Sequence, residues 1–149
     1  MKTIFDPGVR EELIIRIGGL SASDKALWGK MDVGQMVKHC VLSLEWILSG
    51  RRLKGSILGR LIGSMIFKKV MKEERMRKNS PTLGELIVTD TGIDLSRERE
   101  ALVGLVRECG TYAYPDGGFI HPFFGLMTRE QIGEFVYKHL DHHLQQFGR

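Results

Sequence analysis

The chain has few cysteines and no long hydrophobic run. Among its 149 residues only Cys40 and Cys109 are cysteines, and no Cys-x-x-Cys spacing occurs, which argues against a disulfide framework and against a thiolate metal site. The most apolar stretch, "ILGRLIGSMIF", is interrupted by Arg60 and is shorter than the roughly 20 residues that a membrane span requires. Asp6 and Pro7 interrupt the start of the chain before a signal-peptide core develops. These absences predict a soluble cytoplasmic protein with both cysteines in its core.

Aromatic residues are also scarce, which affects how the positive net charge of the chain is interpreted. The formal net charge is +4, aromatic residues make up 8% of the chain, and ten of the 22 Lys and Arg residues lie in the segment 51–78, where Phe67 is the single aromatic. Single-stranded nucleic acid is usually held on aromatic side chains against which its bases stack. We therefore interpret the segment as a solvated helix face and disfavour nucleic acid as a partner. A non-catalytic protein that binds an acidic partner through this basic surface stays as an alternative.

Helical periodicity and helix-start signals fill most of the remaining sequence. The length predicts one domain, residues 1–149. Asp6 before Pro7, Asp32, and Asp94 or Ser96 are N-cap candidates, and Thr128 forms a capping box with Gln131. We predict helices over residues 7–17, 33–48, 56–72, 94–110 and 128–147.

The segments between these helices show no convincing period-two strands. Residues 79–92, "NSPTLGELIVTDTG", are interpreted as an extended crossover, and residues 112–127, "YAYPDGGFIHPFFGLM", as a turn-rich loop. In residues 56–72 apolar side chains recur every three or four positions, while Gly59 and Gly63 either weaken that helix or permit close packing. The sequence therefore predicts an all-α helical bundle with a long crossover.

The last predicted helix carries three histidines in "KHLDHHLQQF". Its apolar positions form one stripe at the helical period, and His139 and His143 fall in that stripe one turn apart, whereas His142 projects about 100° away from His143. Two imidazoles at positions i and i+4 can bind one metal ion. We interpret His139 and His143 as metal ligands in preference to hydrogen-bonded core residues, and place His142 at the rim.

Two ligands leave a metal site incomplete, since catalytic zinc commonly takes three from the protein. The remaining histidines are His39, inside the second predicted helix but outside its main apolar stripe, and His121, in the loop "HPFFG". Periodicity alone leaves His39 open between a ligand and a rim residue. His121 is open between a ligand, a residue at the mouth of the site and a loop residue ordered by its neighbours. The candidate acceptors that would orient the ligand rings are Glu45, Glu134 and Asp141.

Two stretches, "WGKMDVGQMVKHC" and "HPFFGLMTREQIGEFVYKHLDHHLQQFG", resemble the DinB-like (YfiT-like) superfamily, and more closely a branch of it known only as a domain of unknown function. The resemblance spans nearly the whole chain. It implies a four-helix bundle in up-down-down-up order with a long crossover, here accompanied by an extra short helix. It also implies a metal site formed by a histidine of the second helix and two of the last, which are His39, His139 and His143 in this sequence.

These observations predict a divalent-metal-binding bundle, with zinc or nickel as the ion because imidazole suits both. The resemblance implies a thiol-dependent transferase or isomerase, and the metal chemistry allows a hydrolase, acting on an unknown small-molecule substrate. The alternatives are the binding protein named above and a homodimeric scaffold in which the third predicted helix pairs two chains.

Overall fold

The computed structural model describes residues 1–53, 57–72, 75–115 and 118–149, without the side chains of 57–62 and 64. The described chain is mostly helical, as expected for an all-α protein. Its elements in chain order are α1 (Pro7–Gly18), α2 (Val33–Ser49), α3 (Ile57–Lys72), the short 3-10 helix η1 (Gly84–Leu86), α4 (Leu95–Thr111), β1 (Phe119–His121), β2 (Gly125–Met127) and α5 (Arg129–Gln146).

The helix starts lie where the polar capping residues indicate. The Asp32 carboxylate accepts from the Gln35 amide while the Gln35 side chain accepts from the Asp32 amide, and Thr128 and Gln131 form the same reciprocal pair at the start of α5. These bonds satisfy amides that have no partner inside the helix. At α4 the cap is Asp94 and not Ser96. The predicted starts of α1, α2, α4 and α5 are thus confirmed, whereas Ser56, the predicted start of α3, lies outside the described residues.

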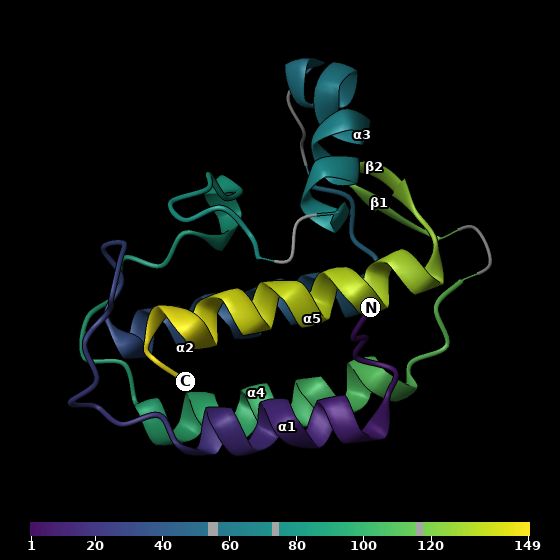
Figure 1. Ribbon diagram of the computed structural model, residues 1–149. Helices are drawn as coiled ribbons and strands as arrows, with labels where there is room; N and C mark the ends of the chain where they lie inside the picture. The colour runs from purple at the N-terminus through teal and green to yellow at the C-terminus, as the bar shows by residue number, and fades with distance from the viewer. Residues whose placement is uncertain (54–56, 73–74, 116–117) are drawn as a thin grey trace.

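Four helices lie side by side and the fifth projects from them (Figure 1). In that view α2 and α4 run from left to right, α1 and α5 run in the opposite direction, and α3 stands above them next to the β strands. Helix α2 packs against α4 and α5, and α1 packs against the same two helices. This arrangement places α2, which carries His39, directly against α5, which carries the other histidines.

The predicted crossover, residues 79–92, and the predicted turn-rich loop, residues 112–127, contain regular structure that the sequence pattern did not predict. Residues 119–121 and 125–127 form an antiparallel hairpin in which Phe119 pairs with Met127 and His121 with Gly125. Each strand has three residues, which is too short for period-two alternation to be recognised. The crossover likewise contains η1, and α4 continues past Gly110, its predicted end, to Thr111.

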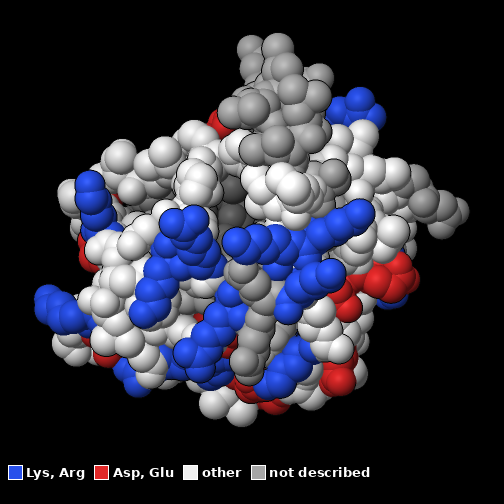
Figure 2. Space-filling view, turned by 45° about the horizontal axis from the view of Figure 1, so that its top comes forward, with Lys and Arg blue, Asp and Glu red and all other residues white. Residues whose placement is uncertain are grey.

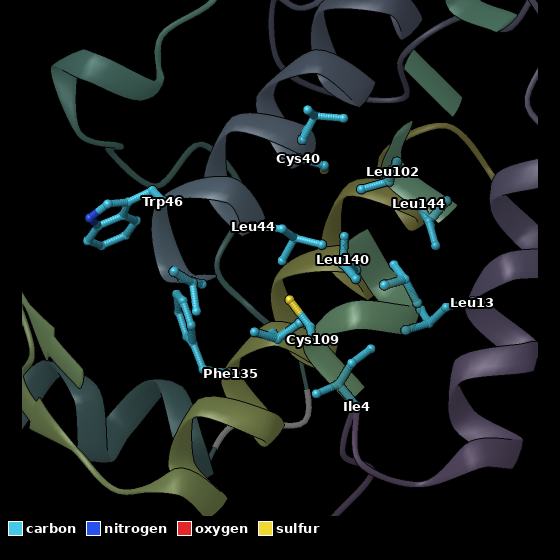
Figure 3. Close-up of a cluster of buried hydrophobic side chains, with 14 of the residues drawn as sticks. Ile4, Leu13, Cys40, Leu44, Trp46, Leu102, Cys109, Phe135, Leu140 and Leu144 are labelled. Atoms are coloured by element: carbon cyan, nitrogen blue, oxygen red, sulfur yellow. The ribbon is translucent and has the colours of Figure 1, made fainter. Parts of the chain in front are cut away.

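The hydrophobic core lies between α1, α2, α4 and α5 (Figure 3). Leu13 of α1, Leu44 of α2, Leu102 of α4, and Leu140 and Leu144 of α5 point toward one another and are each at most 2% exposed. Both cysteines are buried there as free thiols, as the sequence predicted. The core therefore holds the helices that carry the histidines in fixed positions.

Helix α3 contacts the hairpin loop through its backbone at Gly63. A methyl group added to Gly63 would overlap the carbonyl oxygen of Phe123 in the hairpin loop, so the helix and the loop touch there only because residue 63 has no side chain. The predicted close packing at Gly63 thus occurs within the chain, while the side-chain surroundings of Gly59 lie outside the described residues. Two members of the predicted apolar stripe of α3, Met65 and Ile66, are 66% and 41% exposed.

Among the described residues, no helix has the length and apolar character that crossing a membrane would require.

Candidate metal centre

Three histidines from two helices converge between α2 and α5. His39 of α2, and His139 and His143 one turn apart on α5, each present a ring nitrogen within 4.8 Å of the others. The Nε2 atoms of His39 and His139 are 3.2 Å apart, and the ring centroids of His39 and His143 are 4.8 Å apart. The structure thus brings together the three residues that the sequence and the resemblance indicated.

Hydrogen bonds on the far side of two rings fix their tautomers. The Nδ1 of His39 lies 2.8 Å from the carbonyl oxygen of Leu86, which can only accept, so Nδ1 carries the proton and the lone pair is on Nε2. His143 Nδ1 lies 3.0 Å from Gln146 Oε1, and Gln146 Nε2 donates to the Trp28 carbonyl at 2.8 Å, which sets the orientation of the amide. His143 is therefore also protonated on Nδ1. Both rings present an unprotonated Nε2, as metal ligands do when a partner holds the other nitrogen.

Burial keeps all three imidazoles neutral. It lowers the pKa of His143 to about 3 and lowers the pKa of His39 below its usual value, although the Leu86 carbonyl opposes the second shift. Burial also holds the pKa of His139 well below the usual value, and the neighbouring histidines act in the same direction. A neutral imidazole has the free lone pair that metal binding requires. The group is therefore in the protonation state of a ligand set at neutral pH.

The spacing of these nitrogens fits a small divalent ion. Two nitrogens bound to one zinc at about 2.1 Å in tetrahedral geometry are about 3.4 Å apart, close to the 3.2 Å between His39 and His139 Nε2. All three ring nitrogens lie within 4.8 Å of one another. The donor set and its geometry therefore suit zinc or a similar ion.

His142 lies beside this group without belonging to it. Its ring centroid is 5.2 Å from that of His143 and 5.7 Å from that of Trp28, and the side chain is half-buried. It lines a cavity of about 440 Å³ at the end of α5. The rim position inferred from the helical period is where the structure places it.

His121 is held by the hairpin loop. Its Nδ1 accepts hydrogen bonds from the backbone amides of Phe123 and Phe124, and its ring stacks on Phe124 with 4.3 Å between centroids. Burial lowers the pKa of this imidazole to about 4. Of the three roles left open for His121, the structure favours the ordered loop residue.

The sequence did not identify the groups that orient the ligand rings. Asp141, one of the proposed acceptors, bonds to Arg16 and Gln145, and Glu45 is exposed. In the described structure the acceptors are the Leu86 carbonyl and Gln146. Gln146 lies three residues after His143 on the same helix face, so the helical period could have indicated it. The Leu86 carbonyl is a backbone group 47 residues from His39, and no side-chain pattern marks it.

Comparison with known proteins yields one match. Residues 10–149, nearly the whole chain, match a family described as "Protein of unknown function (DUF1569)". In comparisons with the curated proteins and with the solved structures, none matched the chain.

Proposed function

Because the chain belongs to the DUF1569 family, whose description names no activity, we propose a function from its site: the protein is an enzyme that uses one divalent ion held by His39, His139 and His143. The observation that carries this proposal is the convergence of three neutral imidazoles within 4.8 Å, with the Nε2 atoms of His39 and His143 unprotonated. Zinc or nickel is the proposed ion, since both are suited to imidazole ligands.

The open coordination positions of such an ion supply the chemistry. An ion with three protein ligands acts as a Lewis acid, which polarises a carbonyl group and makes a coordinated water or thiol more acidic. The chain itself holds the three rings in place through Leu86 and Gln146 and surrounds them with apolar side chains that exclude water, such as Phe135, which stacks on His139. These roles suit a metal-dependent hydrolase or a thiol-dependent transferase.

The burial of both cysteines limits where the thiol of a thiol-dependent transferase can come from. Cys40 and Cys109, the chain's two cysteines, are buried, and burial raises the pKa of the Cys109 thiol to about 12 and raises that of Cys40 further. Neither forms a thiolate at neutral pH. A thiol transferase built on this site therefore requires the thiol as a second substrate.

The resemblance to the DinB-like superfamily supports the same proposal. Members of that superfamily are four-helix bundles in up-down-down-up order, and the opposite directions of the pair α1 and α5 and the pair α2 and α4 fit that order (Figure 1). The three superfamily ligand positions correspond to the histidines that converge here. We include this bundle topology in the proposal.

A scaffold without catalysis is the alternative. It gives no reason for buried histidines to meet with their tautomers set by specific acceptors, and one glycine assigned to chain pairing, Gly63, contacts Phe123 of its own chain. Pairing of two chains through other surfaces is compatible with the metal site and is a separate question.

Metal content tests the proposal. The protein is stripped with a chelator, reconstituted with Zn²⁺ or Ni²⁺, desalted and measured by elemental analysis, and we expect about one ion per chain. His139→Ala and His143→Ala should lose it, because each removes a ligand, whereas His142→Ala should retain it. A wild-type protein that holds no ion after reconstitution refutes the proposal, and equal loss in His142→Ala shows that the ligands are wrongly assigned.

A further inference from the structure

A cavity of about 440 Å³ is lined in part by His142, while His39, His139 and His143 are not among its lining residues. It is formed where three parts of the chain meet: Leu27 and Trp28 before α2, residues 75–78 after α3, and the last turns of α5 from Lys138 onward. Its volume lies within the roughly 300–1,000 Å³ of small-molecule sites. A second cavity of about 280 Å³, between Ile47 and Tyr112, does not border the histidines.

Two sets of contacts connect the cavity lining to the histidine group. His142, which lines the cavity, has its ring centroid 5.2 Å from that of His143. Trp28, which also lines the cavity and has its ring centroid 5.7 Å from that of His142, accepts from Gln146 through its carbonyl, and Gln146 in turn holds His143. Gly29 has φ 82°, a conformation that favours glycine, and a Cβ there would lie 2.6 Å from Gln146 Nε2, so the chain passes close to α5 at this point. A molecule in the cavity therefore meets His142 and Trp28, which contact His143 and its hydrogen-bond partner Gln146.

Positive charge dominates the lining. Arg75, Lys78, Lys138 and Arg149 line the cavity, and Asp141 is the single carboxylate among the described residues of its wall. Figure 2 likewise shows Lys and Arg side chains gathered across the middle of one face of the molecule. An anionic group entering this space meets a positive field in a concave site, where such fields are strongest.

Two of these charges are already neutralised by ion pairs. Arg16, which is not part of the lining, holds the Asp141 carboxylate at 2.7 Å, and Asp24 holds the guanidinium of Arg149 at 2.6 Å. Lys138 donates to the carbonyl oxygens of Val70 and Met71 at the end of α3 and so fixes the floor of the cavity. The cations that remain to meet a ligand at the rim are Arg75 and Lys78.

Lys78 is held in position by an aromatic ring. Its ammonium lies 4.3 Å from the centroid of the Trp28 ring, a contact that orients the cation without neutralising its charge. The next residue, Asn79, has φ 56°, a left-handed conformation that asparagine tolerates better than most residues and that turns the chain at this point. The wall thus combines a fixed cation with the flat rings of Trp28 and His142.

We propose that this cavity binds the substrate of the metal site, and that the substrate is a small molecule with a carboxylate or phosphate group bound by Arg75 and Lys78 and a flat or apolar part against Trp28 and His142. That the bound molecule is a substrate rests on the proposed function, whereas the binding of an anion in this cavity does not. A nucleic acid is disfavoured as the occupant because Arg75 and Lys78 line a cavity of small-molecule size.

Direct binding to the metal-free protein tests the proposal. Phenyl phosphate and benzoate are titrated against the chelator-treated chain by calorimetry at low salt, with neutral benzyl alcohol as the matched probe. We expect one saturable site for each anion and binding of benzyl alcohol at least about tenfold weaker, because the alcohol lacks the charge-assisted hydrogen bonds. The variant Arg75→Ala/Lys78→Ala should weaken the binding of the anions about tenfold or more, with the fold checked by circular dichroism.

The control variant removes a charge elsewhere. Arg107 is exposed on α4 and does not line the cavity, so Arg107→Ala should leave anion affinity unchanged. Equal weakening by Arg107→Ala, an absence of saturable anion binding, or displacement of phenyl phosphate by a short single-stranded oligonucleotide at lower concentration would each overturn the proposal. The titration uses metal-free protein, so we expect His143→Ala to bind the anions as the wild type does. Anion binding and metal binding are thus tested independently.

Discussion

At the scale of single residues, the histidines of this chain are distinguished by what their Nδ1 atoms contact. His39 and His143 face acceptors, Leu86 O and Gln146 Oε1, and so leave Nε2 unprotonated. His121 faces two donors, the amides of Phe123 and Phe124, so its lone pair on Nδ1 is already engaged and its proton is on Nε2. The same side chain is therefore prepared for metal binding at two positions and for fastening a loop at the third.

Gln146 should act as a positioning residue for the metal site. Gln146→Ala removes the acceptor that holds His143 Nδ1, and loss of such a partner typically weakens metal binding about 10–100-fold. Zn²⁺ affinity measured by competition with a chromogenic chelator should fall in this range. Gln145→Ala is the matched control, because Gln145 bonds to Asp141 and not to a ligand histidine.

A second variant separates positioning from packing. Gln146→Glu keeps an acceptor for His143 but cannot donate to the Trp28 carbonyl, so we expect much of the zinc affinity to return. If Gln146→Ala binds zinc as tightly as Gln145→Ala, Gln146 does not position His143.

The site was predictable from the sequence only where side-chain spacing carries the information. Two histidines four residues apart in an apolar stripe identify His139 and His143. Periodicity does not decide whether His39 is a ligand, and the resemblance supplies that role. The contact of His39 with α5 depends on tertiary packing between residues 100 positions apart in the sequence, which helical spacing does not encode. The Leu86 carbonyl has no counterpart in any side-chain pattern, so only the folded chain reveals it.

At the scale of elements, helix α3 projects from the other four helices (Figure 1). Its contacts include β2, the Phe123 carbonyl at Gly63, Lys138 at its last carbonyls, and the ring of Phe124 against Phe67. The exposed Met65 and Ile66 show that an apolar helical period does not by itself determine which side chains become buried. Its position nevertheless matters, because the segment that follows it supplies Arg75 and Lys78 to the cavity.

Gly63→Ala should loosen this helix. The added methyl group would overlap the Phe123 carbonyl, and such overpacking costs about 1–3 kcal/mol, more than the helix propensity that alanine adds. We expect faster amide hydrogen exchange in residues 65–72 and a lower free energy of unfolding by urea. Gly104→Ala is the control, since a methyl group in the exposed middle of α4 meets nothing within 4 Å and should stabilise by about 0.5–1 kcal/mol. Equal gains in both variants would show that α3 does not pack on Phe123.

Elements with local signals were predictable and those without them were not. The starts of α2 and α5 follow from capping boxes, and the αL conformation of Gly50, φ 62°, ends α2 at Ser49, one residue after its predicted end. The hairpin was missed because its strands have three residues each and pair across a tight loop that His121 fastens. A glycine- and proline-rich stretch indicates turns equally well with or without a hairpin.

At the scale of the whole molecule, the candidate site forms only when the chain folds. Residue 39 is separated by 100 residues from its nearest partner, and the core of α1, α2, α4 and α5 brings them together. Folding also buries all five histidines at least in part, and this burial lowers the pKa of each one. The unfolded chain, with ordinary histidines of pKa about 6.5, therefore binds more protons than the folded chain in mildly acidic solution.

This difference makes the stability of the metal-free protein depend on pH. His121 and His143 have folded pKa values of about 4 and about 3, so they do not affect the pH dependence above about pH 7. As the pH falls from about 6.5 toward 4, only the unfolded state takes up their protons, and each lowers the free energy of unfolding by up to about 1.4 kcal/mol per pH unit. Urea unfolding between pH 7 and pH 5 should show this loss.

The variant His121→Phe should be less stable than the wild type at pH 7, because two amides lose their acceptor. The change of its free energy of unfolding with pH should nevertheless be smaller, by roughly 1 kcal/mol per pH unit, because it lacks one titrating histidine. An unchanged slope would mean that His121 is already protonated in the folded chain, in conflict with its burial and with the two donors it faces.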